Sequence, residues 1–380
     1  MRKIVLAPDS FKGTMSSIEV CAIAAEGIRA VSPEIETVQV PIADGGEGTV
    51  DAFLVAAGGK RRTCKALDPL FREIESFYGI LPDGRTAVIE MAAASGLPLV
   101  GDDKNPLLTT TYGTGQLIAD AIEQGCRRLI IGIGGSATND GGCGMAAALG
   151  ARFLDAAGAE IPLNGGGLAR LDHIDVSRML PLLRDCEIIV ACDVDNPLVG
   201  PEGASAVFGP QKGADPAMAA LLDENLRHYA SVIQRDLGPD LAAVPGAGAA
   251  GGLGAGLLAF TGASVRSGID TVLDCVHFDD LIRDADLIIT GEGRIDGQSL
   301  RGKVPVGIAA RAAKQGVPVI AVVGDIGDDA EKVYQAGIQA VFSTMRRPLP
   351  FEIARCRCRQ DLRATIESLM RFAAICNTRY

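Results

Sequence analysis

The chain has 380 residues, a formal net charge of −11 at pH 7 and no tryptophan, and only 4% of its residues are aromatic. This length is too great for one small core and predicts two domains. The negative charge argues against nonspecific binding to DNA, RNA or an anionic membrane surface. The scarcity of aromatic rings argues against a surface on which bases or sugars stack. Any anionic substrate must therefore meet local positive groups.

The N-terminal segment and the cysteines predict a cytoplasmic protein. Residues 1–11 carry positive charge before an apolar run of four residues, which is far shorter than the core of a signal peptide. No stretch approaches the roughly 18 uninterrupted apolar residues of a membrane span. The 10 cysteines show neither a CxxC spacing nor a disulfide framework, and only 3 histidines are present. We therefore expect reduced thiols and no His-rich metal site.

Short β-branched runs alternate with helical patterns along the chain. The first elements expected are a strand at 3–7, an amphipathic helix near 18–30 and a strand at 36–41. Further strands are expected at 128–133, 187–191, 286–290, 317–323 and 339–343. Most of these runs are continuously apolar, as in strands covered on both faces, which predicts an α/β fold with parallel sheets. No low-complexity linker is expected: the Ala/Gly-rich stretch at 245–256 comes nearest to one, but a core-like pattern resumes at Leu257–Phe260.

Five loops combine glycines or a proline turn with acidic residues. They lie at 8–12, 43–49, 134–142, 193–197 and 291–297. In open parallel sheets, ligands bind where the strands end and the loops begin. Glycine-rich turns before helices offer backbone N–H groups to anions, and carboxylates suit Mg²⁺ that is shared with phosphates. The loops together predict a phosphate–metal centre.

Several motifs suggest other functions but match them incompletely. Gly297–Lys303 fits the start of a P-loop, yet Val304 follows where Ser or Thr is needed. Two glycine patterns resemble dinucleotide fingerprints: the one at 132–137 follows a strand but no helix can start directly after it, and the one at 246–251 has no convincing strand before it. Ser136 lies in GGSAT rather than in the GxSxG of a hydrolase elbow. A nicotinamide-dependent hydroxy-acid oxidoreductase and a non-catalytic hydroxy-acid or nucleotide sensor stay as alternatives to a kinase.

In its motifs the chain resembles bacterial glycerate kinases of the enterobacterial type, from the first strand to near the C-terminus. The matching stretches are 7–12 (APDSFK), 43–49 (ADGGEGT), 90–96 (EMAAASG), 132–142 (GIGGSATNDGG), 191–200 (ACDVDNPLVG), 208–213 (FGPQKG), 245–252 (PGAGAAGG) and 290–296 (TGEGRID). Residues 13–15 and the chain after Ser343 depart from the family pattern.

The resemblance implies ATP-dependent phosphorylation of D-glycerate, with 2-phospho-D-glycerate as the product and with ATP and Mg²⁺ required. It also implies a Rossmann-like three-layer domain formed by residues 1–64 and 280–380. A second α/β domain, residues 65–279, would be inserted between them, with the active site in the cleft. The expected partners are these small molecules, with no nucleic acid or membrane, and the oligomeric state stays open.

Site residues follow from the resemblance together with residue chemistry. Asp193 is the first choice for deprotonating the attacking hydroxyl and Asp296 the second. Lys12 and Arg294 complete the expected catalytic set, with Arg294 as the clamp for a carboxylate or phosphate. The expected metal ligands are Asp44, Glu47 and Glu292. The residues expected to bind substrate or phosphate are Ser10, Gly45, Gly46, Gly134, Gly135, Ser136, Thr138, Asn139, Asn196, Gln211, Lys212 and Lys303.

Overall fold

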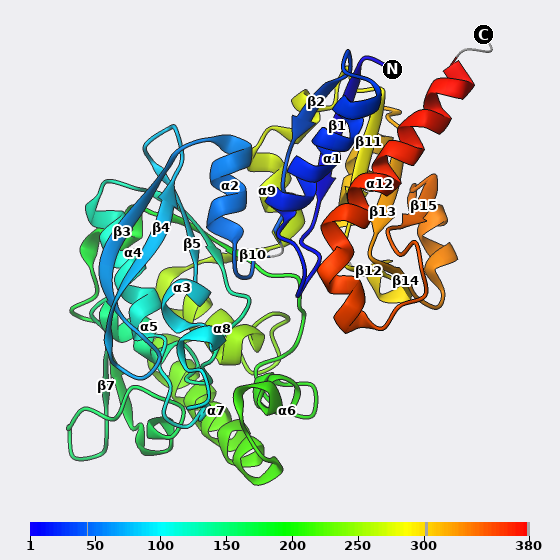
Figure 1. The fold of residues 1–380 in the computed structure, drawn as a ribbon. Helices are drawn as coiled ribbons and strands as arrows, with labels where there is room; N and C mark the ends of the chain where they lie inside the picture. The colour runs from blue at the N-terminus through cyan, green and yellow to red at the C-terminus, as the bar shows by residue number, and fades with distance from the viewer. Residues whose placement is uncertain (44, 301–302, 378–380) are drawn as a thin grey trace. The chain divides into compact units, whose positions relative to one another are not determined.

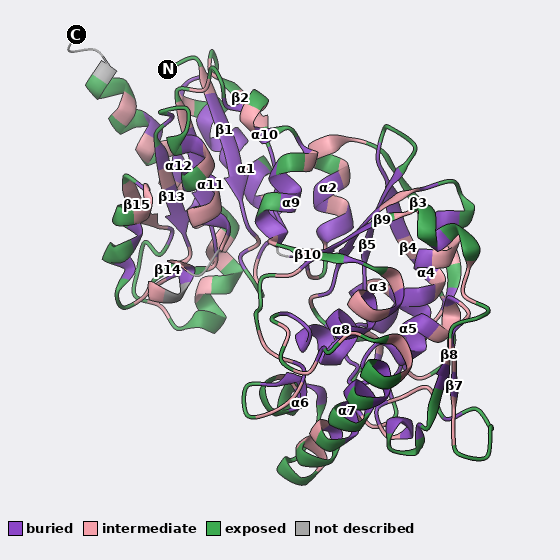
Figure 2. Ribbon diagram, turned by 180° about the vertical axis from the view of Figure 1, so that it is seen from behind, coloured by how far each residue is buried: buried purple, intermediate pink, exposed green. Residues whose placement is uncertain are grey.

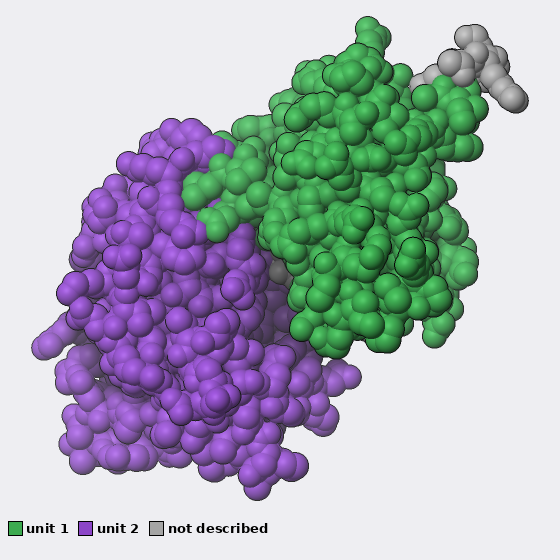
Figure 3. All heavy atoms as spheres, in the orientation of Figure 1, with its two compact units in different colours: residues 1–44, 51–57, 269–380 green, residues 45–50, 58–268 purple. Residues whose placement is uncertain are grey.

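The computed structural model describes residues 1–43, 45–300 and 303–377, and the chain divides into two compact units (Figure 3). Unit 1 comprises Met1–Asp44, Asp51–Ala57 and Ile269–Tyr380, and unit 2 comprises Gly45–Val50 and Gly58–Gly268. These limits differ from the expected ones. Strand β3 (Lys60–Leu67) pairs with β4 (Glu73–Ile80) along its whole length and so belongs to unit 2. Residues 269–279 belong to unit 1.

Unit 1 is built on a five-stranded, fully parallel sheet with the order β15-β13-β11-β1-β2. Numbered within the unit, this is the 2-1-3-4-5 order of the flavodoxin-like doubly wound sheet. Its elements are β1 (Lys3–Pro8), α1 (Ser17–Val31), β2 (Glu36–Gln39), α2 (Thr49–Ala57), α9 (Gly268–Cys275), α10 (Phe278–Leu281), β11 (Leu287–Gly291), β12 (Arg294–Ile295), α11 (Val304–Ala313), β13 (Val319–Val323), β14 (Asp325–Ile326), β15 (Ala340–Ser343) and α12 (Phe351–Asn377), with 3₁₀ turns at Gly297–Leu300 and Ala330–Ala336.

The strands of unit 1 bury both faces, which gives three layers. Ile4 and Leu6 pack in one core cluster with residues of α1 and α12, which lie side by side over that face (Figure 1). Val5 and Ala7 alternate with them, are equally buried, and point to the opposite face. Helix α11 contacts β1, β11 and β13 there. In Figure 2 the strands β1 and β13 accordingly appear as buried segments.

Helix α1 begins at a capping box that the sequence encodes locally. The Ser16 hydroxyl oxygen accepts the backbone N–H of Glu19 at 3.2 Å, and the Glu19 carboxylate accepts the N–H of Ser16 at 2.9 Å. Such a cap stabilises a helix by about 1 kcal/mol. The helix begins one residue before the expected position and ends one residue after it.

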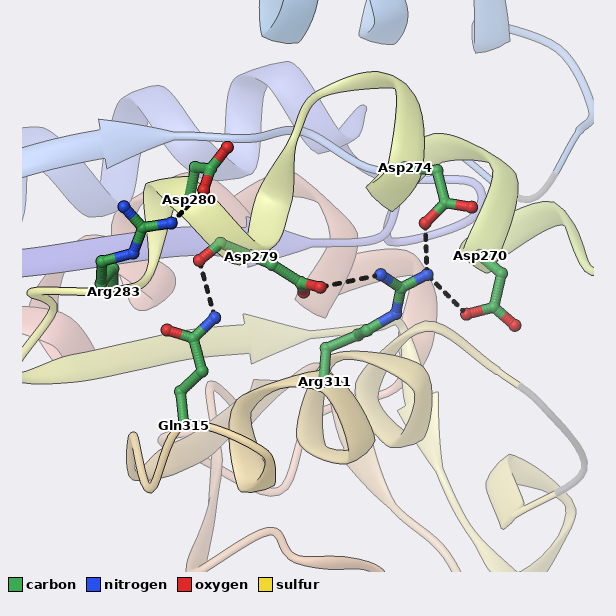
Figure 4. Close-up of polar contacts among 7 residues, drawn as sticks. All are labelled: Asp270, Asp274, Asp279, Asp280, Arg283, Arg311 and Gln315. Atoms are coloured by element: carbon green, nitrogen blue, oxygen red, sulfur yellow. Dashed lines mark hydrogen bonds and ion pairs between the residues drawn. The ribbon is translucent and has the colours of Figure 1, made fainter.

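A cluster around Arg311 ties α11 to the preceding helices (Figure 4). The Arg311 guanidinium lies 3.2 Å from Asp270 and 2.5 Å from Asp274, both on α9, and 3.3 Å from Asp279 on α10. Gln315 adds a hydrogen bond to the Asp279 carbonyl at 2.7 Å. The Arg311 side chain is only 15% exposed, so its pairs are less screened than surface ion pairs. This cluster explains why 269–279 fold with unit 1.

Unit 2 contains a six-stranded sheet with the order β10-β9-β6-β5-β4-β3, in which β3, β4 and β5 are antiparallel neighbours and the others run parallel. Its elements are β3, β4, β5 (Thr86–Glu90), α3 (Ala92–Ser95), α4 (Tyr112–Glu123), β6 (Arg128–Gly132), α5 (Cys143–Ala148), β7 (Arg152–Leu154), β8 (His173–Asp175), β9 (Glu187–Ala191), α6 (Ala204–Phe208), α7 (Pro216–Leu237), α8 (Ala249–Thr261) and β10 (Ser264–Arg266), with 3₁₀ turns at Leu97–Leu99, Gly167–Arg170, Pro181–Asp185 and Pro210–Lys212.

The Ala/Gly-rich stretch is not a linker. It leads into α8, whose residues from Ala249 to Leu257 are all buried in the core of unit 2. Small side chains allow this helix to pack closely against α5 and the loop before it. A Cβ on Gly256 would lie only 2.7 Å from the Gly141 carbonyl oxygen.

Candidate active site

The switch point of the unit 1 sheet lies between β1 and β11, where ligands of doubly wound sheets bind. The two strands end together, with Pro8 opposite Gly291. Their following loops also meet, because a Cβ on Gly293 would lie 3.4 Å from the Lys12 nitrogen and 3.5 Å from the Phe11 Cα. The structure thus brings together two of the loops that the sequence singles out, including the expected residues Ser10 and Lys12.

Glu292 is the most buried acidic residue of this edge, with 5% of its surface exposed. Its Oε2 lies 3.3 Å from the Lys303 ammonium. Its Oε1 is buried and has no hydrogen-bond partner among the described residues. Burial raises the pKa of the Glu292 carboxyl, and hydrogen bonding to Ser299 and the charge of Lys303 oppose that rise. A buried carboxylate oxygen without a partner is costly unless something else binds it.

Arg294 projects from the short strand β12 with 59% of its side chain exposed. Its Nε lies 3.8 Å from an oxygen of Asp296 and 3.6 Å from an oxygen of Asp325. Asp325 was not expected as a site residue. It follows β13 on β14, which pairs with β12, so the strand-end rule applied to 317–323 could have found it.

The described residues of the Gly297–Lys303 segment do not have the form of a P-loop. A 3₁₀ turn occupies Gly297–Leu300, residues 301–302 lie outside the described part, and Lys303 is the N-cap of α11. The Lys303 ammonium pairs with the Glu292 carboxylate. The lysine therefore lies at the edge of the sheet without the P-loop cradle.

In unit 2, two glycine loops are packed against each other at the end of β6. The Gly45 carbonyl accepts the N–H of Gly134 at 3.0 Å. A Cβ on Gly132 would lie 2.5 Å from that carbonyl oxygen, and one on Gly134 would lie 2.8 Å from the Gly46 Cα. The close backbone approach explains why these positions are glycines.

The loop that continues to Gly142 is buried. Ser136 is 5% exposed, and Thr138, Asn139 and Asp140 are fully buried. The Asn139 amide donates to the Ser205 hydroxyl at 3.0 Å. Asp140, which was not among the expected site residues, accepts four hydrogen bonds from Thr111, Gly142 and Gly144. Burial raises the pKa of its carboxyl, and those hydrogen bonds oppose the rise.

Lys212 lies in a different environment from the one expected for a ligand-facing cation. Only 1% of the residue is exposed, and its Nζ donates to the Thr138 carbonyl at 2.6 Å. Burial lowers the pKa of its ammonium to about 7, while the nearby Asp140 favours the charged form. Gln211, the residue before it, is exposed.

The other expected residues of unit 2 lie at the ends of strands or in loops. Asp193 follows β9, is exposed, and accepts the N–H of Gly268 at 2.7 Å. Asn196 donates to the Glu202 carbonyl at 2.8 Å, so its amide shapes its own loop. Glu47 is exposed in unit 2. Asp44 lies outside the described residues. The described residues include no group of three or more His, Cys, Asp or Glu arranged to hold a metal.

The remaining sequence expectations concern thiols and membranes. None of the 10 cysteines, all of which the structure describes, forms a disulfide. Among the described helices, none combines the length and apolarity that crossing a bilayer requires.

Carboxyl ends of parallel strands that carry cations, carboxylates and tight glycine loops fit an enzyme that transfers an anionic group. A model of the "Glycerate kinase family" matches residues 4–374. The chain belongs to the glycerate kinase family and is a kinase.

Proteins of this family align with the chain over nearly its full length, in sequence and in structure. A glycerate 2-kinase of Escherichia coli (strain K12) is 51% identical, with 98% of this chain and 100% of the relative covered. A glycerate kinase of Bacillus subtilis (strain 168) is 52% identical, with 93% and 92% covered. A crystal structure from Salmonella typhimurium LT2, assigned as glycerate kinase 2, superposes with a TM-score of 0.88 at 46% identity and covers 99% of both chains.

Proposed function

We propose that this enzyme uses ATP and Mg²⁺ to phosphorylate D-glycerate on its secondary hydroxyl, which gives 2-phospho-D-glycerate. The 51% identity to an enzyme named glycerate 2-kinase supports this product. The structural observation that carries the proposal is the edge of unit 1, where Lys303 pairs with a buried Glu292 that keeps one oxygen without a partner among the described residues. The disulfide-free cysteines suit the reducing cytoplasm, where we place the reaction.

The residues present fit a magnesium ion. Mg²⁺ takes oxygen ligands and usually shares them with phosphates, and Glu292 Oε1 is a buried oxygen of this kind. We assign Glu292 to the ion, with Asp296 supporting its water shell. Glu47 and Asp44 remain proposed ligands. When bound, Mg²⁺ neutralises charge on the phosphates of the nucleotide.

The protein's own groups supply the remaining steps of an in-line transfer. We assign Lys12, Arg294 and Lys303 to the negative charges of ATP and glycerate, because phosphoryl transfer depends chiefly on positioning and charge neutralisation. Arg294 offers a planar, half-exposed fork that matches a carboxylate or phosphate. Asp193 accepts the proton of the attacking hydroxyl.

A coupled assay of ADP release with ATP, Mg²⁺ and D-glycerate tests the reaction, and phosphorus NMR of the product tests the position. We expect ADP release that depends on glycerate, with phosphate on the secondary carbon. Phosphate on the terminal carbon would overturn the product assignment and leave the kinase. A nicotinamide-dependent absorbance change without ADP release would favour the oxidoreductase, and binding without turnover would favour the sensor.

Replacing Glu292 by glutamine tests the assignment of the metal. We expect the Mg²⁺ concentration for half-maximal activity to rise about 10- to 100-fold, because a neutral amide oxygen replaces a charged ligand. Titration of activity with Mg²⁺ at saturating ATP measures this change. The same substitution at Glu331, an exposed residue of the same unit, is the control and should leave the titration unchanged. An unchanged Mg²⁺ requirement in Glu292→Gln would refute the assignment.

A further inference from the structure

The carbonyl oxygen of Thr138 is enclosed from two directions inside unit 2. The Lys212 ammonium donates to it at 2.6 Å. A Cβ on Gly251 would lie only 1.9 Å from the same oxygen, so the backbone of the α8 N-terminal turn is pressed against it. Gly251 and its neighbours Ala250 and Gly252 all have positive φ, which brings that turn to the loop. Gly251, the last glycine of the 246–251 pattern, therefore serves this contact rather than a dinucleotide.

Neighbouring carbonyls of the same loop also accept hydrogen bonds from other residues of the protein. The Ala137 carbonyl accepts the Thr109 hydroxyl at 2.9 Å, and the Gly135 carbonyl accepts the N–H of Leu97 at 2.9 Å. The backbone N–H groups of Gly135 and Ser136, by contrast, have no partner in the part of the chain that the structure describes. Gly135 has a φ of +76°, the left-handed conformation that lets successive N–H groups converge on an anion.

Burying an ammonium is costly, and an apolar side chain of similar volume would fill the same space without that cost. Lys212 is nonetheless 1% exposed, on a 3₁₀ turn that also carries the αL residue Gly213. The hydroxyl of Thr138 and the Oδ1 of Asn139 are buried beside it without partners among the described residues. The loop thus has two buried polar side-chain atoms that bind no described residue, while Lys212 binds one of its backbone carbonyls.

We propose that Lys212 is a positioning residue: its buried ammonium holds the Thr138 carbonyl inward so that the N–H groups of Gly135 and Ser136 face an anionic oxygen group of a substrate. The group is either the carboxylate of glycerate or a phosphate of the nucleotide, and the inference rests on the proposed kinase reaction. Lys212 itself touches neither substrate. It acts by fixing the orientation of the peptide groups that do.

Lys212→Met tests this inference because it keeps the length of the side chain and removes the donor. We expect the KM of one substrate, glycerate or ATP, to rise about 10-fold or more, since misorienting two charge-assisted N–H contacts weakens binding by about that factor. The KM of the other substrate should change less than about twofold. Lys212→Arg, which can still donate to the carbonyl, should recover part of the loss.

The control is Lys65→Met, which removes an exposed lysine of the same unit and should leave both KM values unchanged. Thermal unfolding separates this effect from a general loss of structure, which would lower the active fraction and leave both KM values as they are. If Lys212→Met does not fold, Lys212→Leu, which also lacks the donor, provides the same comparison of KM values. Equal KM values in wild type and in folded Lys212→Met or Lys212→Leu would overturn the inference.

Calorimetric titration with D-glycerate alone and with ATP alone makes the test independent of turnover. Weaker binding of one ligand to Lys212→Met supports the positioning role even if the wild-type enzyme does not phosphorylate glycerate. In that case the proposed reaction fails and the inference about Lys212 stands. Unchanged binding of both ligands, in a wild-type enzyme that does phosphorylate glycerate, leaves the reaction intact and refutes the role of Lys212.

Discussion

Replacing Asp140 by asparagine is expected to lower the free energy of unfolding of unit 2 by about 3 kcal/mol. Asp140 is fully buried, and its two oxygens accept different donors. Oδ2 accepts the N–H and the hydroxyl of Thr111, both at 2.8 Å, and the N–H of Gly144 at 3.3 Å. Oδ1 accepts the N–H of Gly142 at 3.1 Å. Every contact requires an acceptor.

An asparagine amide cannot meet these demands in either orientation. If its oxygen takes the place of Oδ2, its NH₂ group points at the N–H of Gly142. In the opposite orientation the NH₂ group meets Thr111 and Gly144. Either way at least one buried donor is left without an acceptor, and the charge that strengthened the other bonds is lost. The cost is expected to be large because the site is fully buried.

Urea unfolding of the variant and of wild type measures this loss, with hydrogen exchange identifying the transition of unit 2. Asp155→Asn is the matched control. Asp155 also accepts two backbone N–H groups, from Ala157 and Ala159, and pairs with Arg170, but it lies in an exposed turn where water can replace a lost partner. We expect only a small shift there. Equal losses in the two variants would show that the buried network of Asp140 carries no special stability.

The sequence predicted the strands of the unit 1 sheet because their signal is local, but in unit 2 it missed β4 and the fully buried β5. All of the strands expected from continuous apolar runs are present, with ends shifted by at most two residues. The outer strand β3 was missed because four of its eight residues are charged. Its antiparallel pairing with β4 makes it part of the sheet, and its Arg62 pairs with Asp120 on α4. Helix α12 was not predicted, although Leu362, Ile366 and Met370 recur every four residues as the apolar face of a helix does. All three are buried.

In the candidate site, too, some features could be predicted from the sequence and others could not. The loops that follow β1 and β11 could be matched because both leave the same edge of one parallel sheet. The environment of Lys212 could not be predicted, since its partner Thr138 lies 74 residues away and that carbonyl is enclosed by the packing of Gly251 of α8 against it. Nearby Pro210 and Gly213 indicated a rigid turn, but nothing local indicates which way the lysine points. A charged residue beside glycines is thus an ambiguous signal for a ligand site.

Asp193→Asn is expected to reduce kcat about 100-fold or more while the affinity for ATP changes less than about twofold. Asparagine can keep the hydrogen bond that the Asp193 Oδ1 accepts from Gly268, so the loop after β9 should retain its shape. What the variant loses is the ability to accept a proton from the glycerate hydroxyl. Single-turnover kinetics and calorimetric titration with ATP measure the two quantities separately.

Asp195→Asn is the control for this experiment because Asp195 is an exposed carboxylate two residues further along the same loop. It changes the local charge by the same amount, so a purely electrostatic effect would lower kcat similarly in both variants. A selective loss in Asp193→Asn would identify the proton acceptor, because only that carboxylate is held in place by a backbone N–H donor from Gly268. If Asp193→Asn retains full turnover, the acceptor is not Asp193, and Asp296→Asn becomes the decisive variant.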